Sequence, residues 1–159
     1  MFYQKNESAR EQVFGFMAPA DHVVKCSPND TVKAAAEQIL SNKISAVIVV
    51  DGAVPVGIIT KTDITKAYLG GISLGAKAES IMAKDLKTVS SNLPRDDAAK
   101  IFEEHRIHHA IVVDDGDGHF AGLISAWDIA KECVLDQKAW PYYRHEGDQK
   151  IHATSPKTQ

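Results

Sequence analysis

The sequence predicts an α+β protein built from two similar halves, each with the order strand, helix, strand, strand, helix. Two observations predict it. The string Gly57-Ile58-Ile59-Thr60-Lys61-Thr62-Asp63 returns as Gly122-Leu123-Ile124-Ser125-Ala126-Trp127-Asp128. Each string also follows an apolar run that ends in an aspartate, Asp51 in the first copy and Asp114 in the second. A repeat of this length indicates a duplicated structural unit.

In the first half, which we place at residues 14–70 after a polar arm of residues 1–13, each element has a sequence signal. Residues 23 to 26 are the opening strand, and turn residues follow at 27 to 30. A helix then has one apolar face, formed by Val32, Ala35, Ala36, Ile39 and Leu40. Residues 44 to 50 and 56 to 60 are strands joined by an Asp-Gly turn, and a helix from Thr62 stops at Gly70 and Gly71.

The second half, residues 79–135, repeats these signals after a small-residue linker at 71–78. Thr88 and Val89 are its first strand, and Pro94 occupies the first position of its first helix. Its hairpin loop is two residues longer than that of the first half, as expected of an insertion in a loop. Residues 136–159 are predicted to be a partly disordered tail, whose aromatic cluster Trp140-Pro141-Tyr142-Tyr143 either packs on the module or docks on a partner.

Composition limits the class of protein. The chain has 159 residues, of which 44% are hydrophobic and 25% charged, as expected of a globular protein with room for a shared core. A net charge of −3 with both signs interspersed argues against a nucleic-acid partner. We expect a cytoplasmic protein, because no apolar stretch has the length of a membrane span and the first residues lack a secretion signal. Cys26 and Cys133 lie far apart, which favours reduced thiols.

Neither half has enough apolar surface to cover both faces of a small sheet. We therefore expect the halves to pack on each other around a pseudo-twofold axis, with a pair of clefts between them.

The repeated motif has two compatible interpretations. Thr60 with Asp63, and Ser125 with Asp128, are each a hydroxyl followed three residues later by an acid at a helix start, which is close to a capping box. A short carboxylate at such a place can also accept hydrogen bonds from the two hydroxyls of a ribose, as in other nucleotide sites. Taken alone, each copy favours the structural interpretation.

The paired strings, each after an apolar strand ending in Val-Val-Asp, resemble a tandem pair of cystathionine β-synthase (CBS) domains over about residues 14 to 134. The resemblance implies a Bateman module with two clefts for adenosine-containing ligands: AMP, ADP or ATP, and less readily S-adenosylmethionine or NAD. It implies that Thr60, Asp63, Ser125 and Asp128 hold the ribose, and that no cofactor is obligatory. It also implies a homodimer.

The second copy is in addition similar to a repeat in the γ subunit of AMP-activated protein kinase, where a basic pair before the strand faces the phosphates. His108 and His109 occupy those places here, His109 where that family has arginine. If these histidines contact phosphate, ligand affinity would rise on mild acidification. Ser45 and Ala46 are the matching residues of the first copy, so Lys43 and Lys61 are the candidates for phosphate there.

For the adenine, the resemblance indicates the opening strand and the strand after the basic pair of each half. The candidates are Lys25, Cys26, Ala46 and Ile48 in one cleft, and Thr88, Val89, His109 and Ile111 in the other. Ile48 and Ile111 stand where the family usually has a proline.

Other chemistries find little support. His105, His108 and His109 have a metal-like spacing, but a helix-to-strand boundary near Ile107 would separate them. The hairpin Asp114-Asp115-Gly116-Asp117 lacks the spacing and the glutamate of a calcium loop. No nucleophile elbow, phosphate loop or paired-carboxylate site occurs, so an enzyme is not expected.

The sequence thus favours a regulatory module that senses an adenine nucleotide and modulates an unknown partner protein. The alternative is a ligand-free dimerisation or adaptor module in which the motif only caps helices. Which ligand, which partner and how many clefts fill are left open.

Overall fold

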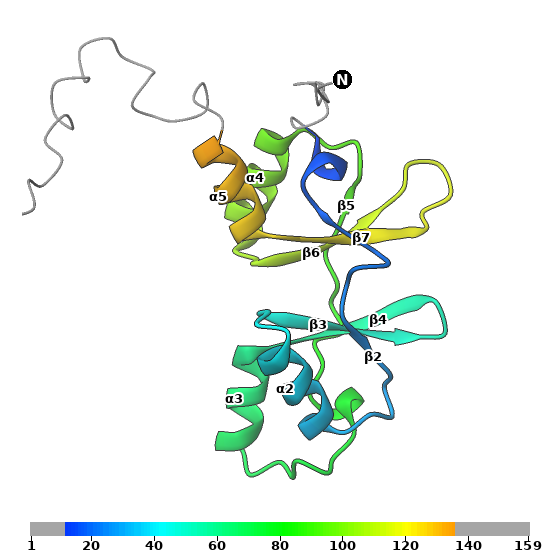
Figure 1. Cartoon of the computed structure of the whole chain (residues 1–159), viewed down its shortest axis with the longest axis vertical. Coiled ribbons are helices and arrows are strands. Elements are labelled where there is room, and N and C mark those ends of the chain that lie inside the picture. The colour runs from blue at the N-terminus through cyan, green and yellow to red at the C-terminus, as the bar shows by residue number, and fades with distance from the viewer. Residues whose placement is uncertain (1–11, 136–159) are drawn as a thin grey trace, which may run out of the picture.

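The computed structural model describes residues 12–135, which form two halves stacked one on the other (Figure 1). The polar arm up to residue 11, the tail from residue 136 and the aromatic cluster at 140–143 lie outside the described residues. Within the described range no helix is both long and apolar enough to cross a membrane.

The first half holds a three-stranded sheet with the order β2-β3-β4. β2 (Lys25–Cys26) runs parallel to β3 (Ala46–Asp51), which pairs antiparallel with β4 (Val54–Thr60). Helices α2 (Val32–Ser41) and α3 (Lys61–Leu69) lie on the face turned away from the other half (Figure 1). A short 3₁₀ helix, η2 (Ala78–Ser80), follows in the linker.

The second half repeats this plan with one strand more, in the order β1-β7-β6-β5. Its strands are β5 (Thr88–Ser90), β6 (His109–Val113) and β7 (Phe120–Ser125), and its helices are α4 (Arg95–His105) and α5 (Ala126–Leu135). The 3₁₀ helix η1 (Val13–Gly15) packs with this half. Both hairpins carry a register shift at the second valine of the Val-Val pair, so the duplication extends to the irregularities of the sheet.

The segment that leads into each half pairs with the sheet of the other half. β1 (Ala18–Pro19) precedes the first sheet in the chain but pairs with β7 of the second. In the same way Ala83, in the segment that leads into the second sheet, exchanges backbone hydrogen bonds with Ile58 of β4. Figure 1 shows the N-terminal segment running beside β7 before it descends to β2.

This exchange explains the glycine that opens each repeated string. A Cβ atom on Gly57 would run into the side chain of Met82, and one on Gly122 would run into the backbone carbonyl of Ala18 and approach the sulfur of Met17 to 3.2 Å. Both glycines are buried, so the close approach of the crossing segment requires the absence of a side chain.

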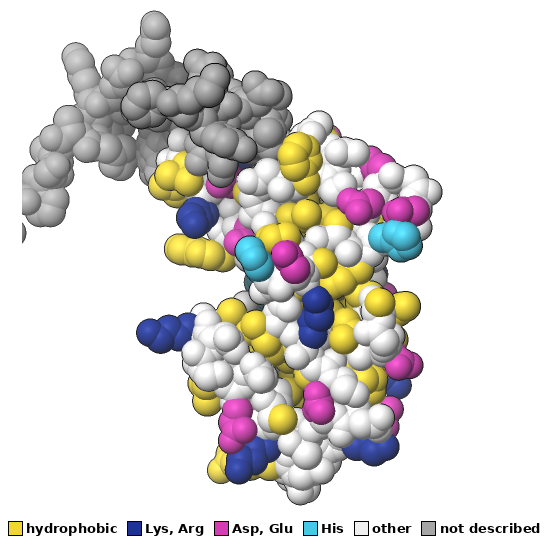
Figure 2. All heavy atoms as spheres, turned by 45° about the vertical axis from the view of Figure 1, so that its right-hand side comes forward, with side chains coloured by type: hydrophobic (Ala, Val, Ile, Leu, Met, Phe, Trp, Pro, Cys, Tyr) yellow, Lys and Arg dark blue, Asp and Glu magenta, His cyan; other side chains and the backbone are white. Residues whose placement is uncertain are grey.

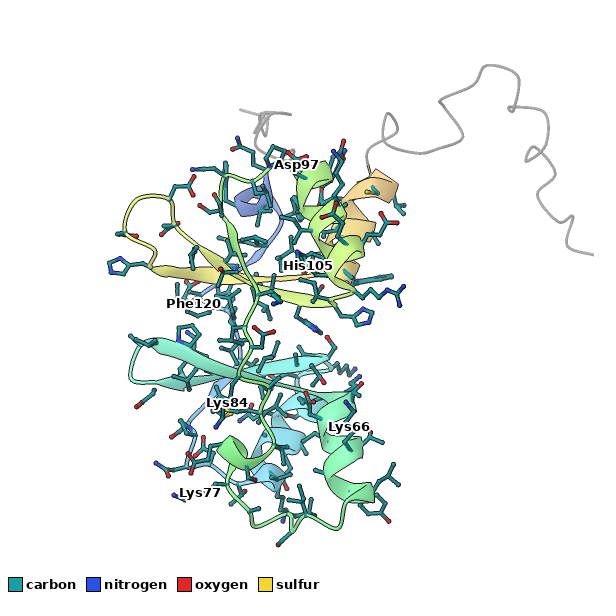
Figure 3. All side chains as sticks on the ribbon, turned by 180° about the vertical axis from the view of Figure 1, so that it is seen from behind. Lys66, Lys77, Lys84, Asp97, His105 and Phe120 are labelled. Atoms are coloured by element: carbon teal, nitrogen blue, oxygen red, sulfur yellow. The ribbon has the colours of Figure 1, made fainter. Side chains whose placement is uncertain are left out.

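The contact between the halves is apolar. Val23, Ile48 and Ile111 form a buried cluster to which both sheets contribute. Phe120 packs against this cluster, and its ring lies 5.7 Å from Nζ of Lys25 of the first half. Figure 3 shows Phe120 on the side of the second sheet that faces the first half. The two sheets therefore share one core, as predicted.

The structure confirms the fold class, the order of elements in each half and the packing of the halves on each other. Three details differ from the prediction. The opening strand has two residues instead of four, and Pro94 caps α4 from outside instead of occupying its first position. Leu40 is 73% exposed although it belongs to the predicted apolar face, because a residue eight positions after Val32 lies about 80° around the helix.

Candidate functional site

Both repeated motifs form complete capping boxes where a strand passes into a helix. The backbone N–H of Thr60 donates to Oδ2 of Asp63 at 2.8 Å, its hydroxyl donates to the same oxygen at 2.7 Å, and the N–H of Asp63 donates back to the hydroxyl at 3.3 Å. Ser125 and Asp128 repeat the arrangement at 2.8, 2.7 and 3.2 Å. The structural interpretation of the motif is thus confirmed.

The capping boxes use one oxygen of each acid. Oδ2 accepts both bonds, whereas Oδ1 of Asp63 and of Asp128 accepts none from the described residues. Both acids are half-buried, directly behind the hydroxyls of Thr60 and Ser125. Each box therefore caps its helix with one carboxylate oxygen and leaves the other without a hydrogen-bond donor among the described residues.

The two boxes face each other across a hollow between the halves, which we call the central chamber. Its volume is about 320 Å³, within the range of small-molecule sites. It is lined by both strand-to-helix junctions and by the residues before β3 and β6: Ser45, Thr60, Lys61, Thr62, His108, His109, Ser125, Ala126 and Trp127. Figure 2 shows the surface notched at the level where the halves meet.

A second hollow, the base slot, adjoins the chamber and shares Thr60, His108 and His109 with it. Its volume is about 190 Å³. Its walls combine apolar and polar residues from both halves: Ile58 and Thr60 of β4, residues 85 to 87 before β5, and residues 107 to 111. The hydroxyl at its rim is that of Thr60, in the first half, while most of the slot belongs to the second half. A ligand held by Asp63 would therefore bridge the halves.

His109 lies where chamber and slot meet. Its Nε2 is 2.8 Å from the hydroxyl oxygen of Ser45, which makes a direct polar link between the halves. Burial, and then the neighbouring His108, lower the pKa of His109 below the ordinary value of 6.5, while Asp128 opposes the shift. His109 is therefore neutral at neutral pH and brings no charge toward a phosphate in this state.

The structure brings together six of the residues predicted for ligand binding. Thr60, Lys61, Ser125, His108 and His109 line the chamber, and Ile111 lines the slot. The others do not line either hollow, and they include both acids of the motif, Asp63 and Asp128, which are half-buried behind Thr60 and Ser125. Cys26 and Val89 are buried in the separate core of their own half, Ala46 and Ile48 are buried, and Lys25, Lys43 and Thr88 are exposed elsewhere.

Burial raises the pKa of the Cys26 thiol to about 11, with a further contribution from Asp30. Cys26 is thus a protonated core residue, because its side chain on the opening strand points to the helices and not to the chamber or the slot.

Sequence reasoning missed the base-slot residues that precede β5, namely Asp85, Leu86 and Lys87, and it missed Trp127. The slot residues lie up to three positions before the predicted Thr88 and Val89. The backbone carbonyl of Lys87 accepts from the N–H of Ile111, and this strand pairing, which brings the residues before β5 to the slot, has no local signal in the sequence. Among the described residues no cluster of His, Cys, Asp and Glu could hold a metal ion.

Comparison with known proteins agrees with this architecture. The family model described as CBS domain matches residues 13–70 and again 78–135. The inosine-5'-monophosphate dehydrogenase of Thermoplasma acidophilum is 32% identical over 107 residues, which are 67% of this chain and 21% of the enzyme. This chain thus spans about a fifth of that relative.

Two solved structures are similar throughout both halves. The CBS domain pair of protein MJ0100, in complex with 5'-methylthioadenosine and S-adenosyl-L-methionine, is 26% identical with a TM-score of 0.66, over 76% of this chain and 93% of that one. The CBS domain of a bacterial CNNM/CorC family Mg²⁺ transporter, in complex with ATP, is 25% identical with a TM-score of 0.69, over 80% and 90%. With the two family-model matches covering both halves, this chain belongs to the CBS-domain family and is a tandem CBS pair.

Proposed function

We propose that this CBS pair is a regulatory module that binds an adenosine-containing ligand between its halves and passes the occupancy to a partner protein. The observation that carries the proposal is the pair of capping boxes around the central chamber, each with one carboxylate oxygen free of hydrogen bonds from the described residues. CBS pairs of similar structure have been solved with adenosine compounds bound.

In the proposed complex the base enters the slot and the ribose hydroxyls donate to Oδ1 of Asp63. The 5' substituent then extends past His108 and His109 into the chamber, because the chamber and the slot share these residues. Asp128 offers the same interaction to a ligand in a pseudo-symmetric position. A ligand that contacts both halves favours the arrangement of the halves that binds it better, and this differential affinity is the signal.

Isothermal titration with AMP, ADP, ATP, S-adenosylmethionine and NAD tests the proposal, with Asp63→Ala and Asp128→Ala as variants. A charge-assisted hydrogen bond contributes about 1.5–3 kcal/mol, so we expect at least about a tenfold loss of affinity for Asp63→Ala. Thr31→Ala is the matched control: Thr31 caps α2 through its hydroxyl, is exposed and does not line either hollow.

Wild-type affinity in both folded aspartate variants would rule out the ribose assignment.

A second function, a ligand-free dimerisation or adaptor module, is favoured by large exposed apolar side chains on α3 and α5: Tyr68, Leu69, Trp127, Val134 and Leu135. It predicts no heat of binding with any of the five compounds, together with a dimer in sedimentation analysis.

A further inference from the structure

The central chamber contains little positive charge. Lys61 is the one lysine or arginine among its lining residues, and most of the remaining polar groups are the hydroxyls of Ser45, Thr60, Thr62 and Ser125. Histidine side chains are mostly neutral near pH 7. Burial keeps His109 in particular neutral, since it lowers the pKa of that imidazole. A phosphate chain in this chamber would meet one full positive charge.

Negative charge stands close by. Asp63 and Asp128 lie directly behind the hydroxyls of the two boxes, at 2.7 Å in each case. Lys87, the one cation that lines the base slot, forms an ion pair of 3.1 Å with Asp85, which lines the slot as well. Two carboxylates thus lie behind hydroxyls that line the chamber, while its one lysine, Lys61, has no ion-pair partner among the described residues. Such a field repels a polyphosphate and attracts a cation.

An aromatic side chain completes this environment. Trp127 lines the chamber and is 75% exposed, at the position of the second motif that Thr62 occupies in the first. Tryptophan is the aromatic residue that attracts a cation most strongly to its face, and it also packs well against sulfur and methyl groups. An exposed tryptophan on the wall of a polar hollow is therefore an apolar and cation-attracting surface.

On the proposed function, which this inference deepens, we propose that the ligand is an adenosine compound whose 5' group is neutral or positively charged, an adenosyl thioether or sulfonium, and not a nucleotide with a phosphate chain. The base and ribose would bind as described above. The 5' group would lie in the central chamber against Trp127, where a sulfonium gains from both carboxylates and a thioether loses nothing.

Titration calorimetry with five probes tests the charge preference: 5'-methylthioadenosine, S-adenosylmethionine, adenosine, AMP, and ATP with and without Mg²⁺. We expect 5'-methylthioadenosine and S-adenosylmethionine to bind at least about tenfold more tightly than AMP or ATP. Tighter binding of AMP or ATP would overturn this inference and leave the proposed function standing. Failure of every probe to bind would overturn the proposed function itself.

The first motif suggests a variant of the second motif that should bind phosphate better. Ala126 holds in the second motif the place of Lys61 in the first, and it lines the chamber. Lys61 is exposed at that place, so a lysine at 126 should be accommodated. We expect Ala126→Lys to raise the affinity for AMP and ATP by about tenfold relative to the affinity for uncharged 5'-methylthioadenosine. An unchanged AMP affinity would overturn the placement of the 5' group in the chamber.

A second variant tests the aromatic wall. Trp127→Ala should weaken S-adenosylmethionine by about tenfold, and 5'-methylthioadenosine less, because only the sulfonium loses a cation–π contact. Since Trp127 is exposed, its removal costs little folding stability, and circular dichroism checks that the variant folds. Equal binding of S-adenosylmethionine by wild type and Trp127→Ala would overturn the role of the tryptophan.

Discussion

One residue makes the two halves of the molecule unequal at their centre. Ala46 lies opposite Thr60 in the first hairpin, and His109 lies opposite Ser125 at the matching place of the second. The histidine reaches across to Ser45 of the first half. The repeat thus keeps the acid of each motif but has a histidine at this strand position in the second half only.

The pH dependence of the folding stability should reflect the titration of His109. The pKa of His109 in the folded protein lies below 6.5 because of burial and His108, while Asp128 opposes the shift and Ser45 faces the ring. The unfolded chain therefore binds the proton more readily. The stability that neutral His109 contributes is complete above a pH of about 6.5 and decreases as the pH falls below that value.

We therefore expect the melting temperature of His109→Gln to fall less than that of the wild type between about pH 7.5 and 5.5. Thermal unfolding followed by circular dichroism measures it. His22→Gln, at a side chain that is 75% exposed, is the control and should follow the wild type. The same acid dependence in wild type and His109→Gln would contradict the assignment.

At the scale of elements, the exchanged entering segments hold the halves together. β1 adds to the edge of β7, and the segment around Ala83, which leads into the second sheet, adds to the edge of β4. Each segment passes directly over a glycine of the repeated string. The glycine that makes the motif recognisable in the sequence is therefore a packing residue, while the hydroxyl of the motif lines the chamber and the acid bonds to that hydroxyl in the capping box.

Replacing each of these glycines with alanine should destabilise the protein to a different extent at the two crossings. In Gly122→Ala the new methyl group meets the Ala18 carbonyl, which is backbone and fixed by the β1–β7 pairing, so we expect a loss of about 1–3 kcal/mol in the free energy of unfolding. In Gly57→Ala the methyl group meets the flexible side chain of Met82, and the loss should be smaller. Urea unfolding of both variants measures the difference, and equal losses would contradict it.

The sequence predicts some elements of the structure better than others. Period and turn residues located the four α-helices of the described residues and the hairpin strands, because each signal is local: the Asp51-Gly52 turn lies in the first hairpin, and Gly71 has a φ of 71° just after α3. The motif acids could be placed at helix starts for the same reason. The composition of the groove could not, since it joins β4 of one half to residues 85 to 87 of the other, and β1 has too few residues to give a strand signal.

For the whole molecule, the shared core makes the two repeats a single folding unit. Ile48 is fully buried, and with Val23 and Ile111 it fills the space between the sheets. A half on its own would expose this cluster and lose the pairing at one sheet edge. The central chamber exists only while the halves are packed on each other.

Ile48→Ala should therefore destabilise both halves together. Removal of a buried isoleucine side chain costs about 2–5 kcal/mol. We expect amide hydrogen exchange in α2 and in α4 to accelerate by the same factor, because both halves unfold in one transition. Val54→Ala, at a side chain that is 63% exposed, is the control. Acceleration confined to α2 would show that the halves unfold independently.

The crossing of β1 also has a consequence for biosynthesis. A ribosome makes Ala18 and Pro19 early, yet their partners Gly122 and Leu123 emerge only after nearly all of the described chain has been made. During translation β1 therefore has no pairing partner until β7 has been made, so the β1–β7 pairing can form only late. Contacts so distant in sequence slow folding. A nascent chain stalled before residue 120 would hence display this strand to other molecules.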